Sequence, residues 1–220
     1  MKLAIRKYGD PALRAKGKRV AEIDDAIREL ADNMLETMRG ANGIGLAAQQ
    51  VGQVLQLTVV DISAVEDRPS SMAWNGKEVD PKEQMPLILL NPQIETGPEK
   101  GVASEGCLSF PEISAEIERA EWAKVQAQTM TGEMVEIEAT GLLARALQHE
   151  IDHLNGILFI DRMSSAARAS VSSRLKRLQK ETQRGLTTSR MEHRSETCVA
   201  HRISSLCSVA RCFSTKPSNI

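Results

Sequence analysis

The sequence predicts an α+β fold with antiparallel or mixed β-sheets. Strand-like segments dominate the middle of the chain and helical patterns follow them, an order typical of this class rather than of regularly alternating folds. The chain has 220 residues, of which 41% are apolar and 26% charged. This length and composition suit one packed domain with an appendage.

The composition also excludes several classes of protein. No apolar run approaches the roughly 18 residues of a membrane span, and the N-terminus lacks the apolar segment of a signal peptide. Four cysteines are too few for a disulfide framework, so we expect a reducing compartment. The bacterial cytoplasm is the expected location, although a processed organellar chain would look the same.

The first half of the chain predicts one helix and two strands. Residues 9–16 indicate a turn and loop. Apolar residues recur at helical spacing from Asp24 to Met38, with Asp24 or Asp25 as the cap and Gly40 at the end. Residues 57–62 and 87–90 predict strands, the second closed by Asn91-Pro92. Residues 63–85 lack periodicity, so we expect a surface loop.

The second half predicts a hairpin followed by helices. Alternation from Val125 to Ala139 around Thr131-Gly132 is typical of a hairpin. An apolar stripe of period 3.6 then runs from Leu142 to Leu154, and Asn155-Gly156 ends that helix. Residues 157–160 predict a short strand, and residues 164–184 a C-terminal helix.

Charge divides the chain into an acidic body and a basic appendage. Residues 1–161 hold 16 basic and 26 acidic residues, a net charge of −10, whereas residues 162–220 hold 12 and 3, a net charge of +9. We therefore expect one folded domain over residues 1–163 and a basic helix over 164–184. Residues 185–220 offer few apolar residues to anchor them, so we expect a disordered tail there.

Two histidines mark the clearest candidate site. His149 and His153 lie one helical turn apart, so both imidazoles project from one helix face and can reach one metal ion. Glu150 stands beside them, close enough to contact a metal-bound water. The alternative is a helix with two surface histidines at chance spacing. The apolar stripe of this helix favours burial, where an unpaired imidazole is costly.

A third ligand is needed, because catalytic metal sites usually have three protein ligands and water. No histidine follows until His193. Cys107, within Glu105-Gly106-Cys107-Leu108-Ser109, is the one cysteine of the acidic body. A thiolate with two imidazoles would make a fairly soft site with one open position. The alternative is that Cys107 is a buried small hydrophobe.

A glycine-rich segment is the third element of interest. Gly43-Ile44-Gly45-Leu46-Ala47-Ala48-Gln49-Gln50 permits close approach of a ligand to the backbone. It is not a phosphate loop, since the third glycine and the Lys-Ser/Thr pair are missing. A glycine turn before a strand of small residues is the alternative.

Together these segments resemble the three signature motifs of the peptide deformylase family, in the family order. The motifs are Gly-x-Gly-Leu-Ala-Ala-x-Gln, Glu-Gly-Cys-Leu-Ser and Gln-His-Glu-x-Asp-His, and the segment from Tyr8 to Arg14 is also similar. The resemblance covers about residues 1–180. It implies antiparallel sheets packed around a central metal-binding helix, and removal of the formyl group from N-formylmethionyl nascent peptides with release of formate.

The resemblance also implies the metal chemistry. Cys107, His149 and His153 would bind one divalent ion with water as the fourth ligand. Fe²⁺ is expected, and Zn²⁺, Ni²⁺ or Co²⁺ can substitute. The metal would lower the pKa of its water, and Glu150 would accept the proton and pass it to the methionine amine.

Other residues acquire supporting roles by the same resemblance. The Gln50 side chain and the Leu108 backbone N–H would stabilise charge on the formyl oxygen. Glu105 and Arg119 would form an ion pair that holds the Cys107 segment, with two separate surface charges as the alternative. We expect Asp152 to orient a histidine or to solvate the helix. The implied substrate-binding residues are Gly43, Ile44, Gly45, Leu142, Arg145 and Ala146, with the Arg145 head group in solvent.

The basic helix and the tail carry further expectations. In some bacterial deformylases a C-terminal helix docks on the ribosome, and a basic helix suits ribosomal RNA phosphates. A solvated helix that covers the body is the alternative. The spacing of Cys198, Cys207, Cys212, His193 and His201 fits no compact zinc motif. The basic residues of the helix are Arg168, Arg174, Lys176, Arg177, Lys180 and Arg184.

Two other functions compete with deformylation. A zinc peptidase would use His149, Glu150 and His153 without Cys107. A ribosome- or RNA-binding module that has lost catalysis would rely on the basic helix, although intact Glu150, Gln50 and Cys107 argue against it.

Overall fold

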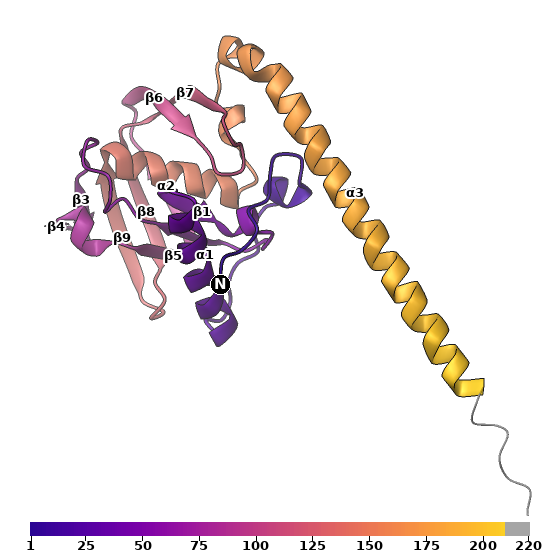
Figure 1. The fold of residues 1–220 in the computed structure, drawn as a ribbon. Helices are drawn as coiled ribbons and strands as arrows, with labels where there is room; N and C mark the ends of the chain where they lie inside the picture. Colours follow the sequence, from indigo (N-terminus) through magenta and orange to yellow (C-terminus); the bar gives the residue numbers. More distant parts are fainter. Residues whose placement is uncertain (210–220) are drawn as a thin grey trace, which may run out of the picture.

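The fold is α+β, as the sequence predicts. It is described by a computed structural model that covers the backbone of residues 1–209 and the side chains of residues 1–188. A seven-stranded sheet and a separate two-stranded sheet contain only antiparallel pairs. Helix α2 (Gly141–Leu154), which carries the histidine pair, contacts strands of both sheets and lies at the centre of the domain (Figure 1).

The spatial order of the strands in the larger sheet differs from their order in the chain. In spatial order the larger sheet contains β1 (Gly45–Ala47), β2 (Leu57–Val60), β5 (Leu87–Thr96), β8 (Trp122–Gln128), β9 (Met134–Thr140), β3 (Met72–Trp74) and β4 (Lys77–Val79). The smaller sheet pairs β6 (Lys100–Gly106) with β7 (Ser114–Ala120). The remaining elements are α1 (Asp25–Gly40), α3 (Ser165–Val209) and the 3-10 helices η1 (Pro11–Arg14), η2 (Ala48–Val51), η3 (Pro81–Gln84) and η4 (Phe159–Asp161).

Several local predictions are confirmed. The Asp24 side chain accepts a hydrogen bond of 2.9 Å from the Ile27 N–H, so Asp24 caps α1. The β8–β9 hairpin turns at Gly132, whose φ of 90° suits glycine. Helix α2 buries its apolar stripe against the larger sheet, with Leu143 and Leu147 fully enclosed. Burial of this stripe anchors the helix that carries the candidate site.

The expected surface loop at 63–85 is wrong in part. It contains the β3–β4 hairpin, and β3 extends the larger sheet by pairing with β9. Asn75 and Gly76 have φ values of 50° and 77°, as a tight two-residue hairpin turn requires. This Asn-Gly pair is the signal that could have revealed the hairpin.

The expected end of a strand at Asn91-Pro92 is also wrong. Strand β5 continues to Thr96, and its register with β8 shifts between Leu90 and Gln93. Asn91 adopts a φ of 52° there, and a proline without an N–H is tolerated at such an irregularity. Because pairing resumes after the bulge, the strand is longer than its apolar segment suggests.

The expected strand at 157–160 is replaced by the 3-10 helix η4. Asp161 closes this turn, since its side chain accepts from the Leu158 N–H at 2.9 Å and its N–H donates to the Leu158 carbonyl at 2.8 Å. Leu158, Phe159 and Ile160 are all buried. A continuous apolar run without alternation does not distinguish a strand from a buried turn.

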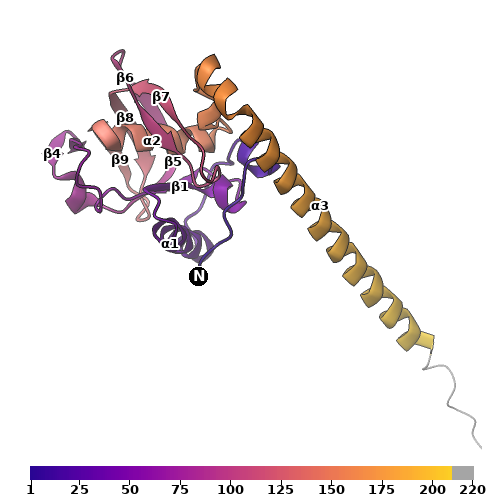
Figure 2. The same cartoon turned by 45° about the horizontal axis from the view of Figure 1, so that its top comes forward.

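Helix α3 begins as predicted but does not end at residue 184. It continues to Val209, because residues 186–209 contain no proline or glycine that would break a helix. Residues 210–220 of the expected tail lie outside the described residues. Only the first part of α3 contacts the domain, and the helix then extends away from it (Figures 1 and 2).

The contact between α3 and the domain is apolar at its centre. Val171 and Leu175 are buried in a cluster with Phe110 and Phe159. At its edge, the Arg174 side chain donates to the Glu112 carbonyl at 3.2 Å. Through this contact, α3 packs against residues 110–113, which follow Cys107 in the chain.

The anchoring of α3 is testable at Leu175. Leu175→Ala leaves a cavity in this cluster and lowers the free energy of unfolding by about 2–4 kcal/mol. The exposed neighbour Lys176 serves as the control, since Lys176→Ala changes stability by less than about 0.5 kcal/mol. Chemical denaturation of both variants gives the comparison, and equal values would contradict a docked helix.

Candidate metal centre and active site

The three candidate metal ligands converge as the sequence predicts. Cys107 follows β6, and both histidines lie on α2. The Cys107 Sγ lies 3.2 Å from the His153 Nε2, and ligand atoms of all three residues fall within 4.8 Å of one another. Helical spacing brings the imidazoles together, while the sheet topology supplies the thiol.

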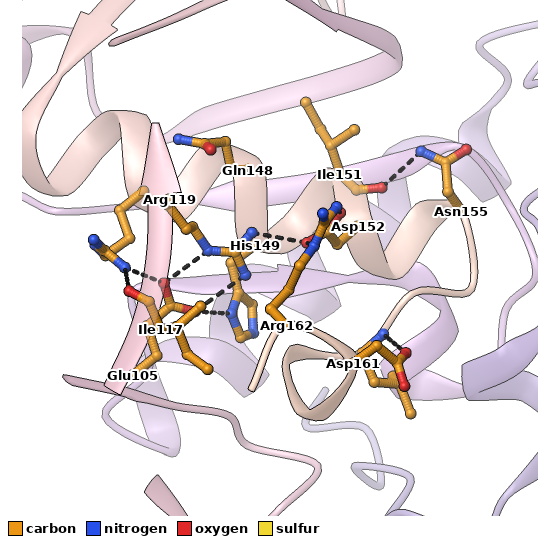
Figure 3. A network of polar contacts seen from close by, with 12 residues as sticks. Glu105, Ile117, Arg119, Gln148, His149, Ile151, Asp152, Asn155, Asp161 and Arg162 are labelled. Atoms are coloured by element: carbon orange, nitrogen blue, oxygen red, sulfur yellow. Dashed lines mark hydrogen bonds and ion pairs between the residues drawn. The ribbon is translucent and has the colours of Figure 1, made fainter. Parts of the chain in front are cut away.

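A buried carboxylate fixes the orientation of His149. Glu105 Oε2 lies 3.1 Å from His149 Nδ1, which leaves the other ring nitrogen for a metal. The same carboxylate accepts from Arg119 Nε at 2.7 Å and from Arg145 Nη1 at 2.7 Å. The predicted Glu105–Arg119 pair is therefore a buried ion pair (Figure 3), and the alternative of two separate surface charges is wrong.

Asp152 extends this network rather than orienting a histidine or solvating the helix. Its carboxylate accepts from Arg119 at 2.7 Å and from Arg162 at 2.6 Å (Figure 3). Gln148, on the same helix, exchanges hydrogen bonds with the backbone N–H and carbonyl of Ala120. Spacing along the sequence did not reveal these partners, because they lie on β7 and after η4.

Burial and this network shift the pKa values of the site residues in different directions. Burial alone would raise the pKa of Glu105, but hydrogen bonds with His149 and Arg119 lower it to about 2. Burial opposes charge on His149, yet hydrogen bonds with Cys107 and Glu105 raise its pKa to about 10. Burial lowers the pKa of His153 well below its usual value. A metal at His149 therefore has to displace a proton.

Glu150 lies beside the ligands and is almost completely buried. Burial raises its pKa to about 7, and its Oε2 has no hydrogen-bond partner among the side chains described. Gly45 permits this position, because a Cβ there would lie 2.3 Å from Glu150 Oε1. The glycine thus leaves room for the carboxyl group.

Gln50 and Leu108 present hydrogen-bond donors to the same space. The Gln50 Oε1 accepts from the Ala47 N–H at 2.8 Å, so its Nε2 points toward Cys107 Sγ at 3.5 Å and Ser109 Oγ at 3.4 Å. The Leu108 N–H donates no hydrogen bond within the described part of the chain. The Leu108 N–H therefore remains available for a ligand, and the Gln50 amide group faces the same cavity.

A cavity of about 720 Å³ unites the site, within the range of small-ligand pockets. Apart from buried His153, every residue that the sequence analysis assigned to the site lines it. The expected solvent position of the Arg145 head group is wrong, because it donates to Glu105 and to the carbonyls of Ile117 and Gly101. The assigned residues along its wall are Gly43, Ile44, Gly45, Gln50, Cys107, Leu108, Leu142, Arg145, Ala146, His149 and Glu150.

These residues fit a divalent metal ion. One sulfur and two imidazole nitrogens converge, His149 is oriented through its second nitrogen as metal-bound histidines usually are, and the unpartnered Glu150 oxygen fits a polar ligand such as water. The side chains of the five tail Cys and His residues at 193–212 lie outside the described residues. Among residues 1–209, no helix has the length and apolar content needed to cross a lipid bilayer.

Comparison with known proteins decides the family. The model of the polypeptide deformylase family matches residues 2–169. This chain belongs to the peptide deformylase family. A deformylase of Endomicrobium trichonymphae is 44% identical over 179 residues, covering 81% of this chain and 96% of the relative. One of Opitutus terrae is 44% identical over 186 residues, covering 83% and 95%.

Solved deformylase structures share the fold. A plant peptide deformylase superposes with a TM-score of 0.72 at 38% identity, covering 83% of this chain and 92% of that one. The Thermotoga maritima deformylase gives a TM-score of 0.63 at 42% identity, covering 74% and 99%. The chain is therefore a metal-dependent amide hydrolase that removes the formyl group from N-formylmethionyl polypeptides and releases formate. Neither the peptidase nor the non-catalytic RNA-binding alternative is needed.

The buried ion pair of this deformylase predicts a large stability effect. Arg119→Met leaves the Glu105 and Asp152 carboxylates without their shared partner, so the free energy of unfolding falls by about 3–5 kcal/mol. Lys100→Met is the control on the same small sheet, because its 3.0 Å pair with Glu118 is exposed and is worth at most about 1 kcal/mol. Denaturant titration compares them, and similar losses would contradict the network.

The contact between Gly45 and Glu150 predicts a catalytic effect. Gly45→Ala forces the Glu150 carboxyl group to move and lowers kcat/KM for a formyl-peptide by about 10²-fold. Gly97→Ala is the control, since its Cβ would meet no atom closer than 3.6 Å. Circular dichroism confirms that both variants fold, and full activity of Gly45→Ala would show that the close approach is unimportant.

Proposed function

We propose that Cys107, His149 and His153 hold the catalytic metal and that Fe²⁺ is the ion in the cell. The convergence of these three ligands beside the buried, unpartnered Glu150 carboxyl group is the observation that carries the assignment. A thiolate with two imidazoles suits Fe²⁺ and equally Zn²⁺, Ni²⁺ or Co²⁺. The preference for iron rests on the family resemblance.

Glu150 is the general acid and base of this proposal. When bound, the metal supplies Lewis acidity that makes water a nucleophile near neutral pH. Glu150 takes the proton from the attacking water and delivers it to the methionine amine as the C–N bond breaks. A pKa of about 7 in its buried position suits both steps.

Gln50 and Leu108 stabilise the charge that develops on the formyl oxygen. The Ala47 N–H holds the Gln50 oxygen, so the Gln50 amide group presents its N–H₂ to the cavity without reorganisation during the reaction. The Leu108 N–H is the second donor. Fixed donors of this kind typically contribute ~10²–10³ in rate each.

The formyl-methionyl group occupies the cavity next to these donors. Its methionine side chain packs against Ile44, Leu142 and Ala146, and the aliphatic stem of Arg145 adds to this wall. Gly43 and Gly45 let the substrate backbone approach. A Cβ at Gly43 would lie 2.8 Å from the Leu108 side chain, so this glycine also keeps the second donor in place.

Formate release tests the assigned acid–base residue. Protein purified anaerobically and loaded with Fe²⁺ or Ni²⁺ releases formate from a formyl-Met-Ala peptide, and Glu150→Ala loses the activity while it retains the metal. Metal analysis of the variant separates this result from loss of the ion. Residual activity close to wild type would remove Glu150 from the mechanism.

The third ligand has its own test. Cys107→Ser weakens metal binding and activity together, because the soft thiolate is lost. Retained metal with full activity would instead favour a site built from His149, Glu150 and His153. Removal of the metal by a chelator and its return should abolish and restore activity in the wild-type protein.

We further propose that residues 1–163 form the catalytic domain and that the basic start of α3, residues 164–184, contacts ribosomal RNA. Lys176, Lys180 and Arg184 recur every four residues and are exposed, so they follow one helix face. None forms an ion pair in the described part of the chain. The cytoplasm, where ribosomes make formylated chains, is the proposed location.

Ribosome binding tests this part of the proposal. Replacement of Lys176, Lys180 and Arg184 by Gln should weaken co-sedimentation with ribosomes and reduce its salt dependence. Formate release from a short peptide should not change. Unaltered ribosome association would leave α3 as a solvated helix that covers the domain.

A further inference from the structure

The segment before β3 holds the start of the metal-binding helix. Thr140 precedes α2 but makes no side-chain cap. Instead, the Ser70 Oγ accepts from the Leu143 N–H at 3.0 Å, and the Ser71 carbonyl accepts from the Thr140 N–H at 3.1 Å. A side chain from another segment therefore takes the place of the usual N-cap residue.

Pro69 makes this contact especially close. A Cβ on Gly141 would lie 2.2 Å from the Pro69 carbonyl oxygen, and Gly141 has a φ of 63° that favours glycine. Residues 69–71 are thus fixed against the first turn of α2. Arg68 immediately precedes them in the chain, so these contacts place it close to the start of α2.

Arg68 lines the active-site cavity near Leu142. Its side chain is exposed and forms no ion pair within the described side chains. It also borders a neighbouring cavity of about 680 Å³ that contains Asp67, Glu99 and Glu121, yet none of these carboxylates comes within ion-pair distance. An unpaired guanidinium can accept an anionic ligand group.

The carboxylates of the active-site cavity do not pair with this cation. Glu105 is already held within the buried network by Arg145 and His149. Glu150 is almost completely buried, and Glu112 lies at another part of the cavity wall, among residues 110–114. None of these three carboxylates forms an ion pair with Arg68 in the described part of the chain, so its guanidinium remains free for a ligand.

We propose that Arg68 is a specificity-determining residue that pairs with an acidic side chain just after the formyl-methionine of the substrate. This inference rests on the proposed placement of the formyl-methionyl group in the cavity. The methionine side chain lies against Leu142, so the following one or two residues pass the mouth that Arg68 borders. The enzyme therefore favours formylated chains with Asp or Glu at position 2 or 3 over those with Lys.

Amidated peptides test the preference without a terminal carboxylate. The substrates are formyl-Met-Glu-Ala, formyl-Met-Gln-Ala and formyl-Met-Lys-Ala amides, with a second series that carries Glu, Gln or Lys at position 3. The wild-type enzyme should show a KM about two- to fivefold lower for Glu than for Gln in one series, the size expected of an exposed ion pair. The advantage should shrink at high salt.

Variants assign the preference to Arg68. Arg68→Gln should remove the advantage of the Glu peptide over the Gln peptide, and Arg68→Glu should reverse the order of the Glu and Lys peptides. Lys82→Gln is the matched control. It also removes an exposed cation from residues 63–85, but Lys82 does not line the cavity. Neither change should alter the metal content.

Several outcomes would overturn the inference. These are equal KM values for the Glu, Gln and Lys peptides in both series, a preference that persists in Arg68→Gln, and a preference lost in Lys7→Gln instead. Each of these outcomes would leave the proposed deformylase function standing. Failure to hydrolyse any of the formyl-peptides would refute the proposed function itself, so the two failures are distinguishable.

Discussion

The Glu105 carboxylate is the constraint on which the site depends. It is buried and accepts from Arg119 and Arg145 while it holds His149. A buried charge without such partners would be strongly destabilising. Its partners come from β7 and α2, whereas Glu105 lies one residue before the end of β6. Pairing of this one carboxylate therefore holds the Cys107 segment beside the two histidines.

The rest of the molecule holds α2 where this cluster needs it. Its first turn is capped by Ser70, and its last turn carries Asp152, which is tied to Arg119 and Arg162. Gly45 lets β1 approach Glu150 closely. On the far side of the Cys107 segment, α3 packs through Leu175. Helix α2 is thus held at both of its ends and from β1.

The sequence predicts the features that depend on contacts between residues close together in the chain. The four-residue spacing of His149 and His153, the Asp24 cap and the turn at Gly132 all follow from short-range geometry. Cys107 is a candidate ligand because it is the one cysteine of the acidic body, and the family resemblance then implies it as the third ligand, since no spacing rule links β6 to α2. The partners of Asp152 and the buried head group of Arg145 were missed for the same reason. The β3–β4 hairpin was missed although Asn75-Gly76 signalled its turn.

The proposed metal centre consists of one sulfur and two imidazole nitrogens. X-ray absorption spectroscopy of the full chain, loaded anaerobically with one equivalent of Fe²⁺ or Zn²⁺, measures these neighbours. We expect one sulfur and two imidazole nitrogens around the metal, and loss of the sulfur signal in Cys107→Ser. A spectrum of the wild-type protein with only nitrogen and oxygen neighbours would rule out Cys107 as a ligand.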